Sequence, residues 1–319
     1  MEDIEVFDLI AFGRSCVDFT YVVESGEGEN SKSPIKDEIV SGGGQAATSA
    51  VVVSLLGGKS AYVGNLGWDE GGMLLLKEFR RFNVDCRWVE RPNQFQTPKA
   101  LVIVDKLTGK RNIYYQPKQK HFPCPLPEEA FGRCKTLILD PEISEEDLQR
   151  VKSWKQSETI VVYDAERHRP ALDSMKGFAD FFIASESILD IDPEIKRQEA
   201  LKKLLTNVKG ELIITFGEHG SIWWKDKMVP VHIPCIRLNN TCDTTGAGDV
   251  FHASFAYFYP KLNDIILTIK YATYCAGLST TIIGTRGKID YKLDLERVVA
   301  GMNEEYLSVL PDWLFGTKS

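Results

Sequence analysis

The residues best suited to chemistry form the stretch Asp243–Asp249, which reads Asp-Thr-Thr-Gly-Ala-Gly-Asp. Apolar residues follow it at helical spacing, so the glycines precede or open a helix. The first amides of a helix lack partners within the helix and carry partial positive charge, which favours an anion. We therefore expect phosphoryl transfer, in which the amides of Gly246, Ala247 and Gly248 stabilise charge and the carboxylate of Asp249 accepts the proton of the attacking hydroxyl.

This stretch has a plainer interpretation, an aspartate-capped helix that follows a glycine turn. The two aspartates that bracket the stretch, directly before an apolar helix, favour the chemical interpretation. Because the start of a helix stabilises the charged form of a carboxyl, we expect Asp249 to be a weak base that takes the proton late in the reaction.

A second glycine-rich stretch, Gly42-Gly43-Gly44, opens an apolar and therefore buried helix that extends towards residue 56. Glycines there would allow a ligand to approach the backbone closely. Asp18 follows a buried strand expected over residues 6–13, and ligands of open α/β sheets bind beyond the carboxyl ends of strands. Asp18 therefore either accepts hydrogen bonds from hydroxyl groups of a ligand or caps a loop.

Both stretches resemble signatures of one family. Residues 243–256 (DTTGAGDVFHASFA) resemble the second signature of the ribokinase/PfkB family of carbohydrate kinases, and residues 41–57 (SGGGQAATSAVVVSLLG) resemble the first. Their separation of about 200 residues fits that family. The resemblance spans essentially the whole chain and is nearest to the ketohexokinase-like and sulfofructose-kinase-like branches.

The resemblance implies the ribokinase-like α/β fold, with a central, mostly parallel sheet, helices on both faces and a small β lid. From residue 136 onwards, strand and helix patterns alternate, which by itself predicts a parallel sheet with crossover helices. Residues 99–105 and 111–116 alternate like a hairpin. We expect one domain over residues 1–319, with lid segments at about 19–40 and 98–116.

The resemblance also implies which residues bind the sugar and the nucleotide. Asp18, Gly43, Gly44 and Thr48 match sugar-binding positions, although many members have asparagine where this chain has Thr48. Nucleotide-binding positions match a glycine turn that, on its own, could be an ordinary turn between strands. These positions are Thr215, Gly217 and Gly220.

A monovalent-cation site, expected to hold K⁺, is implied by the same resemblance. It would combine the first aspartate of the core stretch with backbone carbonyls of the loop that follows the next helix, expected to run to about Ile283. The matching positions are Asp243, Thr245, Ile282, Thr285 and Gly287. Without the resemblance, this segment is simply a loop that ends a helix.

Several polar residues follow strand ends, and for each a helix-capping role is favoured over a place in the site. They are Asp140, Asp164, Glu166, Ser185 and Glu186. The family often has an N-x-x-E stretch near phosphates and Mg²⁺, but this chain has Ser185-Glu186-Ser187-Ile188 there. His252 is expected to be a packed or surface residue.

Composition limits the other function classes. The chain has 319 residues, 43% of them hydrophobic, and a net charge of -7. There is no basic run typical of nucleic-acid binding and no apolar span of 18 residues, so neither nucleic acid nor a membrane is an expected partner. The seven scattered cysteines form no C-x-x-C pair and indicate reduced thiols in a cytoplasmic protein.

The sequence therefore predicts an ATP- and Mg²⁺-dependent sugar kinase. Its acceptor is expected to be a neutral ketohexose or pentose, because Asp140-Pro141-Glu142 stands where a sulfonate pocket would need arginine. One alternative is a nucleoside kinase of the same fold, and another is a catalytically silent sugar-binding or regulatory member. A homodimer formed through the lid is expected from the resemblance alone.

Overall fold

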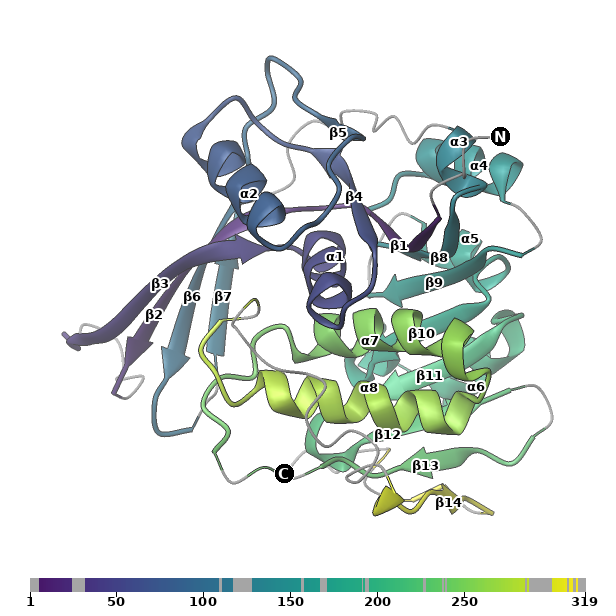
Figure 1. Cartoon of the computed structure of the whole chain (residues 1–319). Coiled ribbons are helices and arrows are strands. Elements are labelled where there is room, and N and C mark those ends of the chain that lie inside the picture. Colours follow the sequence, from purple (N-terminus) through teal and green to yellow (C-terminus); the bar gives the residue numbers. More distant parts are fainter. Residues whose placement is uncertain are drawn as a thin grey trace.

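The computed structural model shows a large sheet flanked by helices, with a small sheet that extends from one side (Figure 1). It describes residues 6–24, 32–108, 111–116, 128–155, 158–166, 171–190, 192, 195–225, 228–236, 238, 240–284, 286, 300–308, 310–311 and 314. Within these ranges, no helix is both long and apolar enough to cross a membrane.

The large sheet has the strand order β14-β13-β12-β11-β10-β9-β8-β1-β4-β5. Its strands are β1 Phe7–Phe12, β4 Ser60–Asn65, β5 Val89–Glu90, β8 Cys134–Leu139, β9 Ile160–Ala165, β10 Phe181–Ser185, β11 Glu211–Thr215, β12 Ser221–Trp224, β13 Val231–Ile233 and β14 Glu305–Tyr306. The pairs from β5 to β11 are parallel, and those from β11 to β14 are antiparallel. The predicted α/β class with a mostly parallel sheet is therefore confirmed.

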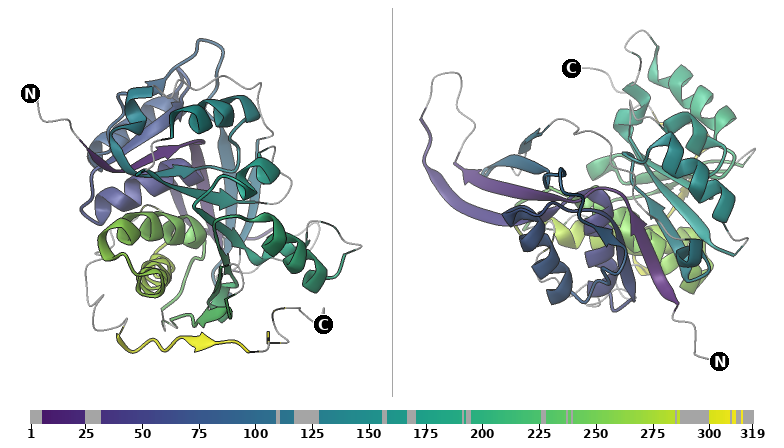
Figure 2. Two further views of the ribbon diagram at one scale, coloured as in Figure 1. Left: turned by 90° about the vertical axis from the view of Figure 1, so that its right-hand side faces the viewer. Right: turned by 90° about the horizontal axis from the view of Figure 1, so that it is seen from above.

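Helices cover both faces of the large sheet (Figure 2). One face carries α1 Gln45–Leu55, α2 Glu70–Arg81, α7 Ala247–Leu262 and α8 Ile265–Ser279; the other carries α3 Glu128–Phe131, α4 Glu145–Trp154, α5 Leu172–Lys176 and α6 Arg197–Asn207. In β1, Leu9 and Ala11 join the first apolar cluster, whereas Ile10 and Phe12 join the second. Burial on both faces explains why the parallel strands are mostly apolar.

The small sheet has the order β3-β2-β6-β7 and extends away from the body of the molecule (Figure 2). Its strands are β2 Cys16–Val23, β3 Ile35–Gly43, β6 Lys99–Asp105 and β7 Arg111–Tyr115. β2 pairs antiparallel with β3 and parallel with β6, and β6 and β7 form the predicted hairpin. The strands overlap the segments expected to form a lid, and β2 and β3 extend three residues further at the ends nearest the body. Residues 25–31 and 109–110 of those segments lie outside the described residues.

Helix α8 ends earlier than the sequence predicted, at Ser279 instead of about Ile283. The amides of Thr280 and Thr281 bond to carbonyls three residues back, which tightens the last turn. Gly284 then adopts a φ of 81°, a left-handed conformation that favours glycine. The early end leaves residues 280–284 as a loop that reaches the start of the core stretch.

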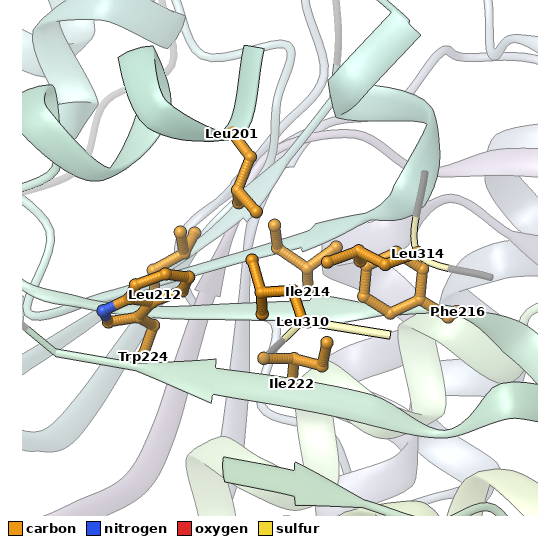
Figure 3. A pocket seen from close by; sticks show the side chains of 8 residues that line it. All are labelled: Leu201, Leu212, Ile214, Phe216, Ile222, Trp224, Leu310 and Leu314. Carbon is orange, nitrogen blue, oxygen red and sulfur yellow. The ribbon is translucent and has the colours of Figure 1, made fainter. Parts of the chain in front are cut away.

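A small apolar pocket lies beside β11 and β12 (Figure 3). Its walls are Leu201, Leu212, Ile214, Phe216, Ile222, Trp224, Leu310 and Leu314. Its volume of about 10 Å³ is hardly room for one water molecule. It is a packing gap where the C-terminal residues Leu310 and Leu314 cover the sheet, and we assign it no ligand.

Candidate active site

A cavity of about 340 Å³ opens where the small sheet meets the carboxyl ends of β1, β9, β10 and β11. Cavities of small-molecule sites span roughly 300–1,000 Å³. Asp18 and Gly44 line one part of it, and Thr245, Gly246, Gly248 and Asp249 line another. The structure therefore brings the expected sugar-binding and phosphate-binding residues into one cavity.

The core stretch turns into α7 as the glycine pattern predicted. Gly246 precedes the helix with a φ of 72°, in the left-handed region where a side chain would be strained. At Gly248, the position of a Cβ has no atom from elsewhere within 4 Å. The first turn of α7 therefore presents its backbone to open space in the cavity, which suits an anion.

Asp249 is a buried carboxyl whose pKa is raised to about 8. Burial is the main cause, and the nearby carboxylate of Asp164 raises the pKa further, whereas His252 lowers it. The pKa is thus shifted in the direction opposite to the expected stabilisation of the charged form, because the carboxyl is buried and lies near other carboxylates. A pKa near the working pH suits a general base.

Asp18, Gly43 and Gly44 form the part of the cavity expected to bind sugar. The thiol of Cys16 donates to Oδ1 of Asp18 at 3.1 Å, and burial raises the pKa of Asp18. A Cβ on Gly43 would lie 2.0 Å from Oδ2 of Asp18, so only glycine lets the carboxylate pack against this turn. Gly44 has a φ of 90° and faces the backbone of Arg14.

Thr48 lies behind this turn and outside the cavity lining. Its side chain is fully buried, and its Oγ1 accepts a hydrogen bond from Nε of Arg286 at 3.3 Å. A direct contact between Thr48 and a ligand in the cavity therefore requires a rearrangement of this pair.

Asp243 joins the core stretch to the loop after α8. Its Oδ1 accepts from the amide of Thr245 at 2.8 Å, and its Oδ2 accepts from the amide of Gly284 at 2.9 Å. Oγ1 of Thr245 is buried and makes no hydrogen bond within the described residues. Ile282 is half-buried in the same loop, whereas the predicted positions Thr285 and Gly287 lie outside the described residues.

The expected nucleotide-binding turn follows β11. Thr215 lines the cavity, and its Oγ1 is 3.4 Å from the carbonyl of Ala184. Gly217 and Gly220 bound the short 3-10 helix η2 (Gly217–His219) and adopt φ values of 53° and 85°. Their glycine character is explained by backbone conformation, and neither residue lines the cavity.

Sequence reasoning did not assign several of the residues that line the cavity. They are Arg14, Gln45, Arg111 and Tyr115. Nε2 of Gln45 donates to Glu166 at 3.0 Å, and Nη1 of Arg111 donates from the small sheet to Oγ1 of Thr244 at 2.6 Å. Their only sequence signal was position, at a strand end or within a strand of the lid.

The residues after strand ends divide into two groups. Asp164, Glu166 and Ser185 line the cavity, contrary to the favoured capping role. Asp140 instead accepts hydrogen bonds from the amides of Arg14 and Glu142. Glu186 lies in η1 (Glu186–Asp190), where it pairs with Arg197 at 3.2 Å.

The open, mostly parallel sheet and the glycine-opened helix at its carboxyl edge define a ribokinase-like α/β protein. The solved structure of Arabidopsis thaliana ribokinase complexed with ribose and ATP matches with a TM-score of 0.75, 21% identity, and coverage of 92% of this chain and 99% of that one. Within this class, the chain belongs to the PfkB family of carbohydrate kinases, because residues 6–291 match the model of the "pfkB family carbohydrate kinase" family. It is thus a phosphotransferase with an alcohol acceptor.

Relatives within the family act on different acceptors, as their names indicate. A deoxyribokinase of Salmonella typhi is 25% identical over 295 residues, covering 88% of this chain and 94% of the relative. Ketohexokinase of Mus musculus is 24% identical over 309 residues, covering 89% and 99%. A nucleoside kinase of Methanocaldococcus jannaschii is 25% identical over 307 residues, covering 90% and 96%.

Proposed function

We propose that this protein transfers the γ-phosphoryl group of ATP to a hydroxyl of a small neutral sugar, a ketohexose or a pentose. The observation that carries the proposal is the shared cavity, which Asp18 and Gly44 line together with Asp249 and the start of α7. A sugar bound at Asp18, Gly43 and Gly44 would have a hydroxyl within the same enclosed space as Asp249.

In this mechanism, Asp249 accepts the proton of the attacking hydroxyl, while the backbone of Gly246, Ala247 and Gly248 stabilises charge on the transferred group. The raised pKa of Asp249 means that the carboxyl must lose its own proton before it can act as the base. Closure of the small sheet would exclude water, which otherwise competes as phosphoryl acceptor. For this reason we propose that the small sheet acts as a lid on a single kinase domain.

The nucleotide is proposed to bind along the carboxyl ends of β10 and β11, next to Thr215 and the turn bounded by Gly217 and Gly220. Mg²⁺ neutralises phosphate charge when it is bound with ATP. The described residues contain no group of three or more histidine, cysteine, aspartate or glutamate side chains that could hold a metal. We therefore propose that the phosphates of ATP supply most of the ligands of Mg²⁺.

The residues around Asp243 fit a monovalent cation, proposed to be K⁺. The buried, unpaired Oγ1 of Thr245 supports this proposal, because buried polar atoms normally have partners. The carboxylate of Asp243, which joins Thr245 and Gly284, adds negative charge at the same place. Carbonyls near Ile282, Thr285 and Gly287 complete the proposed site.

A nucleoside kinase is the second candidate, because a nucleoside kinase of Methanocaldococcus jannaschii and the deoxyribokinase of Salmonella typhi are each 25% identical to this chain. A silent sugar-binding member is the third. An ADP-release assay with Mg²⁺-ATP, with and without K⁺, separates the three. Its acceptors are fructose, ribose, 2-deoxyribose, adenosine and sulfofructose, and the Asp249→Asn variant is the control. Turnover with a neutral sugar that requires Asp249 supports the proposal. Turnover with adenosine alone, or no turnover with any of these acceptors, contradicts it.

We also propose that the lid joins two copies of this chain, in the cytoplasm. Val40, Leu101 and Tyr114 lie side by side across the small sheet, on the face that points away from the cavity. Ala100 and Val102, on the opposite face, line the cavity. The side chains of Val40, Leu101 and Tyr114 are 50%, 39% and 62% exposed, which supports contact with the same face of a second copy of this chain. Sedimentation should give a dimer that Leu101→Glu weakens, and a monomeric wild type would contradict the proposal.

A further inference from the structure

Arg286 is a buried arginine outside the cavity lining, on the loop that follows α8. Its side chain is 1% exposed and forms an ion pair with Glu78 of α2, with 2.9 Å between Nη1 and Oε2. Its Nη2 donates to the carbonyl of Gly43 at 2.7 Å, and its Nε donates to Thr48. One side chain thus connects α2, α1 and the glycine turn at the end of β3.

Glu78 completes the connection from the other side. Both of its carboxylate oxygens lie 3.0 Å from the amide of Gly42, which donates to them. A Cβ on Gly42 would lie 1.9 Å from Nη1 of Arg286 and 2.2 Å from Oε2 of Glu78. The glycine at position 42 is therefore explained by the ion pair that packs against it, and Gly43 by the packing of Asp18.

The loop that carries Arg286 also contacts two other parts of the site. The amide of Gly284 donates to Asp243 at the start of the core stretch. Ile283 packs against Val22, Val102 and Val104 of the small sheet. The loop therefore lies between the phosphate-binding stretch, the lid and the sugar-binding turn.

We propose that Arg286 is a positioning residue for the sugar: with Glu78 it holds the Gly42–Gly43 turn against Asp18 and ties that turn to the loop that Asp243 holds. This inference rests on the proposed sugar-kinase function. Arg286 does not line the cavity and so does not touch the reacting atoms. Its effect on catalysis therefore acts through the Gly42–Gly43 turn. The positive charge of Arg286 also favours the ionised form of Asp18, which accepts hydroxyl hydrogen bonds.

The test compares Arg286→Gln and Arg286→Lys with a control at a more exposed, ion-paired arginine, Arg87→Gln. Arg87 binds Asp85 through Nε and Nη2 in a segment that does not line the cavity. Hydrogen–deuterium exchange of the peptide around Gly42 reports on the turn without any need for activity. We expect faster exchange there in Arg286→Gln, a smaller change in Arg286→Lys and none in Arg87→Gln.

Steady-state kinetics then test the role in sugar binding. Loss of a charge-assisted hydrogen bond should raise the KM for the sugar on the order of tenfold to a hundredfold in Arg286→Gln, with the KM for ATP changed less than about threefold. Equal changes in both KM values, or unchanged exchange in a folded variant, overturn the inference. If Arg286→Gln does not fold, Glu78→Gln should give the same pattern more weakly. A wild type without turnover refutes the proposed function, while the exchange measurement still decides whether Arg286 holds the turn.

Discussion

Nε2 of His252 lies 3.4 Å from Oδ1 of Asp164 in the wall of the cavity. Nδ1 of the same ring is 2.6 Å from the carbonyl of Gly248, and Nε2 is also 3.3 Å from the carbonyl of Ile183. One imidazole therefore connects the first turn of α7 to β9 and β10. His252 was expected to be a packed or surface residue; it is buried, and it packs in the cavity wall.

The first prediction concerns the contacts that His252 makes with α7, β9 and β10. His252→Gln should lower kcat about tenfold, because a glutamine reaches fewer of these oxygens and the first turn of α7 loses part of its support. Thr136→Val is the matched control, since Oγ1 of the buried Thr136 ties α7 to β8 through the carbonyl of Ala256 at 3.0 Å. Both variants should unfold at a lower temperature, but only His252→Gln should lose kcat. Equal kcat losses would show that general stability, and not the site, is affected.

The second prediction follows from the raised pKa of Asp249, about 8. The deprotonated carboxylate is the base, so its population increases as pH rises through this value. We expect kcat/KM for the sugar to increase from pH 6 to pH 9, measured with saturating Mg²⁺-ATP and at constant ionic strength. A rate that is constant across this range would mean that Asp249 is already ionised in the reacting complex.

The third prediction combines activity and stability in Asp249→Asn. Loss of the base should lower kcat by roughly 10²–10⁴-fold. The carboxyl has a folded-state pKa above its unfolded value of 3.8, so the folded state binds more protons between these pKa values and stability falls as pH rises from about 4 to 8. At pH 8 the neutral variant should therefore be more stable than wild type, by an amount on the order of a few kcal/mol.

Chemical denaturation at pH 5 and pH 8 checks the stability half of this prediction, because the difference between variant and wild type should be larger at pH 8. Near-normal turnover in a folded Asp249→Asn protein would refute the assignment of the base.

Local sequence patterns predicted the parallel sheet because its strands are buried on both faces, while the rest of the fold was implied by the resemblance to the family. Runs such as Phe7–Phe12 are apolar except for Asp8, and the Lys99–Asp105 strand alternates as expected for a sheet with one exposed face. Two glycines of the signature stretches, Gly44 and Gly246, likewise have a local cause, a positive φ. Features that a few neighbouring residues determine were thus accessible from the sequence.

The rest of the site depends on contacts between distant residues. Arg286 and Gly43 are 243 positions apart, and Arg111 and Thr244 are 133 apart. An arginine on a loop or in a lid strand has the same local pattern as a solvated surface residue, so neither was assigned a role. The pKa of Asp249 was mispredicted for a similar reason, since it depends on burial and on Asp164, which lies in β9.

The fourth prediction tests the packing of the sugar-binding turn. Gly43→Ala would place a Cβ 2.0 Å from Oδ2 of Asp18, so the carboxylate must move. We expect the KM for the sugar to increase at least about tenfold, the loss of one strong hydrogen bond, with ATP binding unchanged. Gly132→Ala is the control, because a Cβ there meets nothing within 4 Å. A Gly43→Ala enzyme with the wild-type KM would show that Asp18 does not bind the sugar in the position seen here.

The fifth prediction uses the unpaired hydroxyl of Thr245. A buried hydroxyl without a partner costs free energy, so its removal in Thr245→Val should leave the unfolding temperature unchanged or higher in the absence of ligands. If this oxygen binds K⁺ or a phosphate in the working enzyme, the same variant should lose K⁺ activation or show a several-fold higher KM for ATP. Thr273 is a matched control, since its Oγ1 is also buried without a partner, on α8.

Thr273→Val should reproduce the stability effect without the kinetic one, because Thr273 does not line the cavity. The comparison therefore separates a hydroxyl that a ligand uses from one that is merely tolerated in the core. Identical K⁺ dependence and ATP kinetics in the two variants would exclude Thr245 from the cation and phosphate sites. The unpaired oxygen of Thr245 would then be a packing compromise of the same kind as that of Thr273.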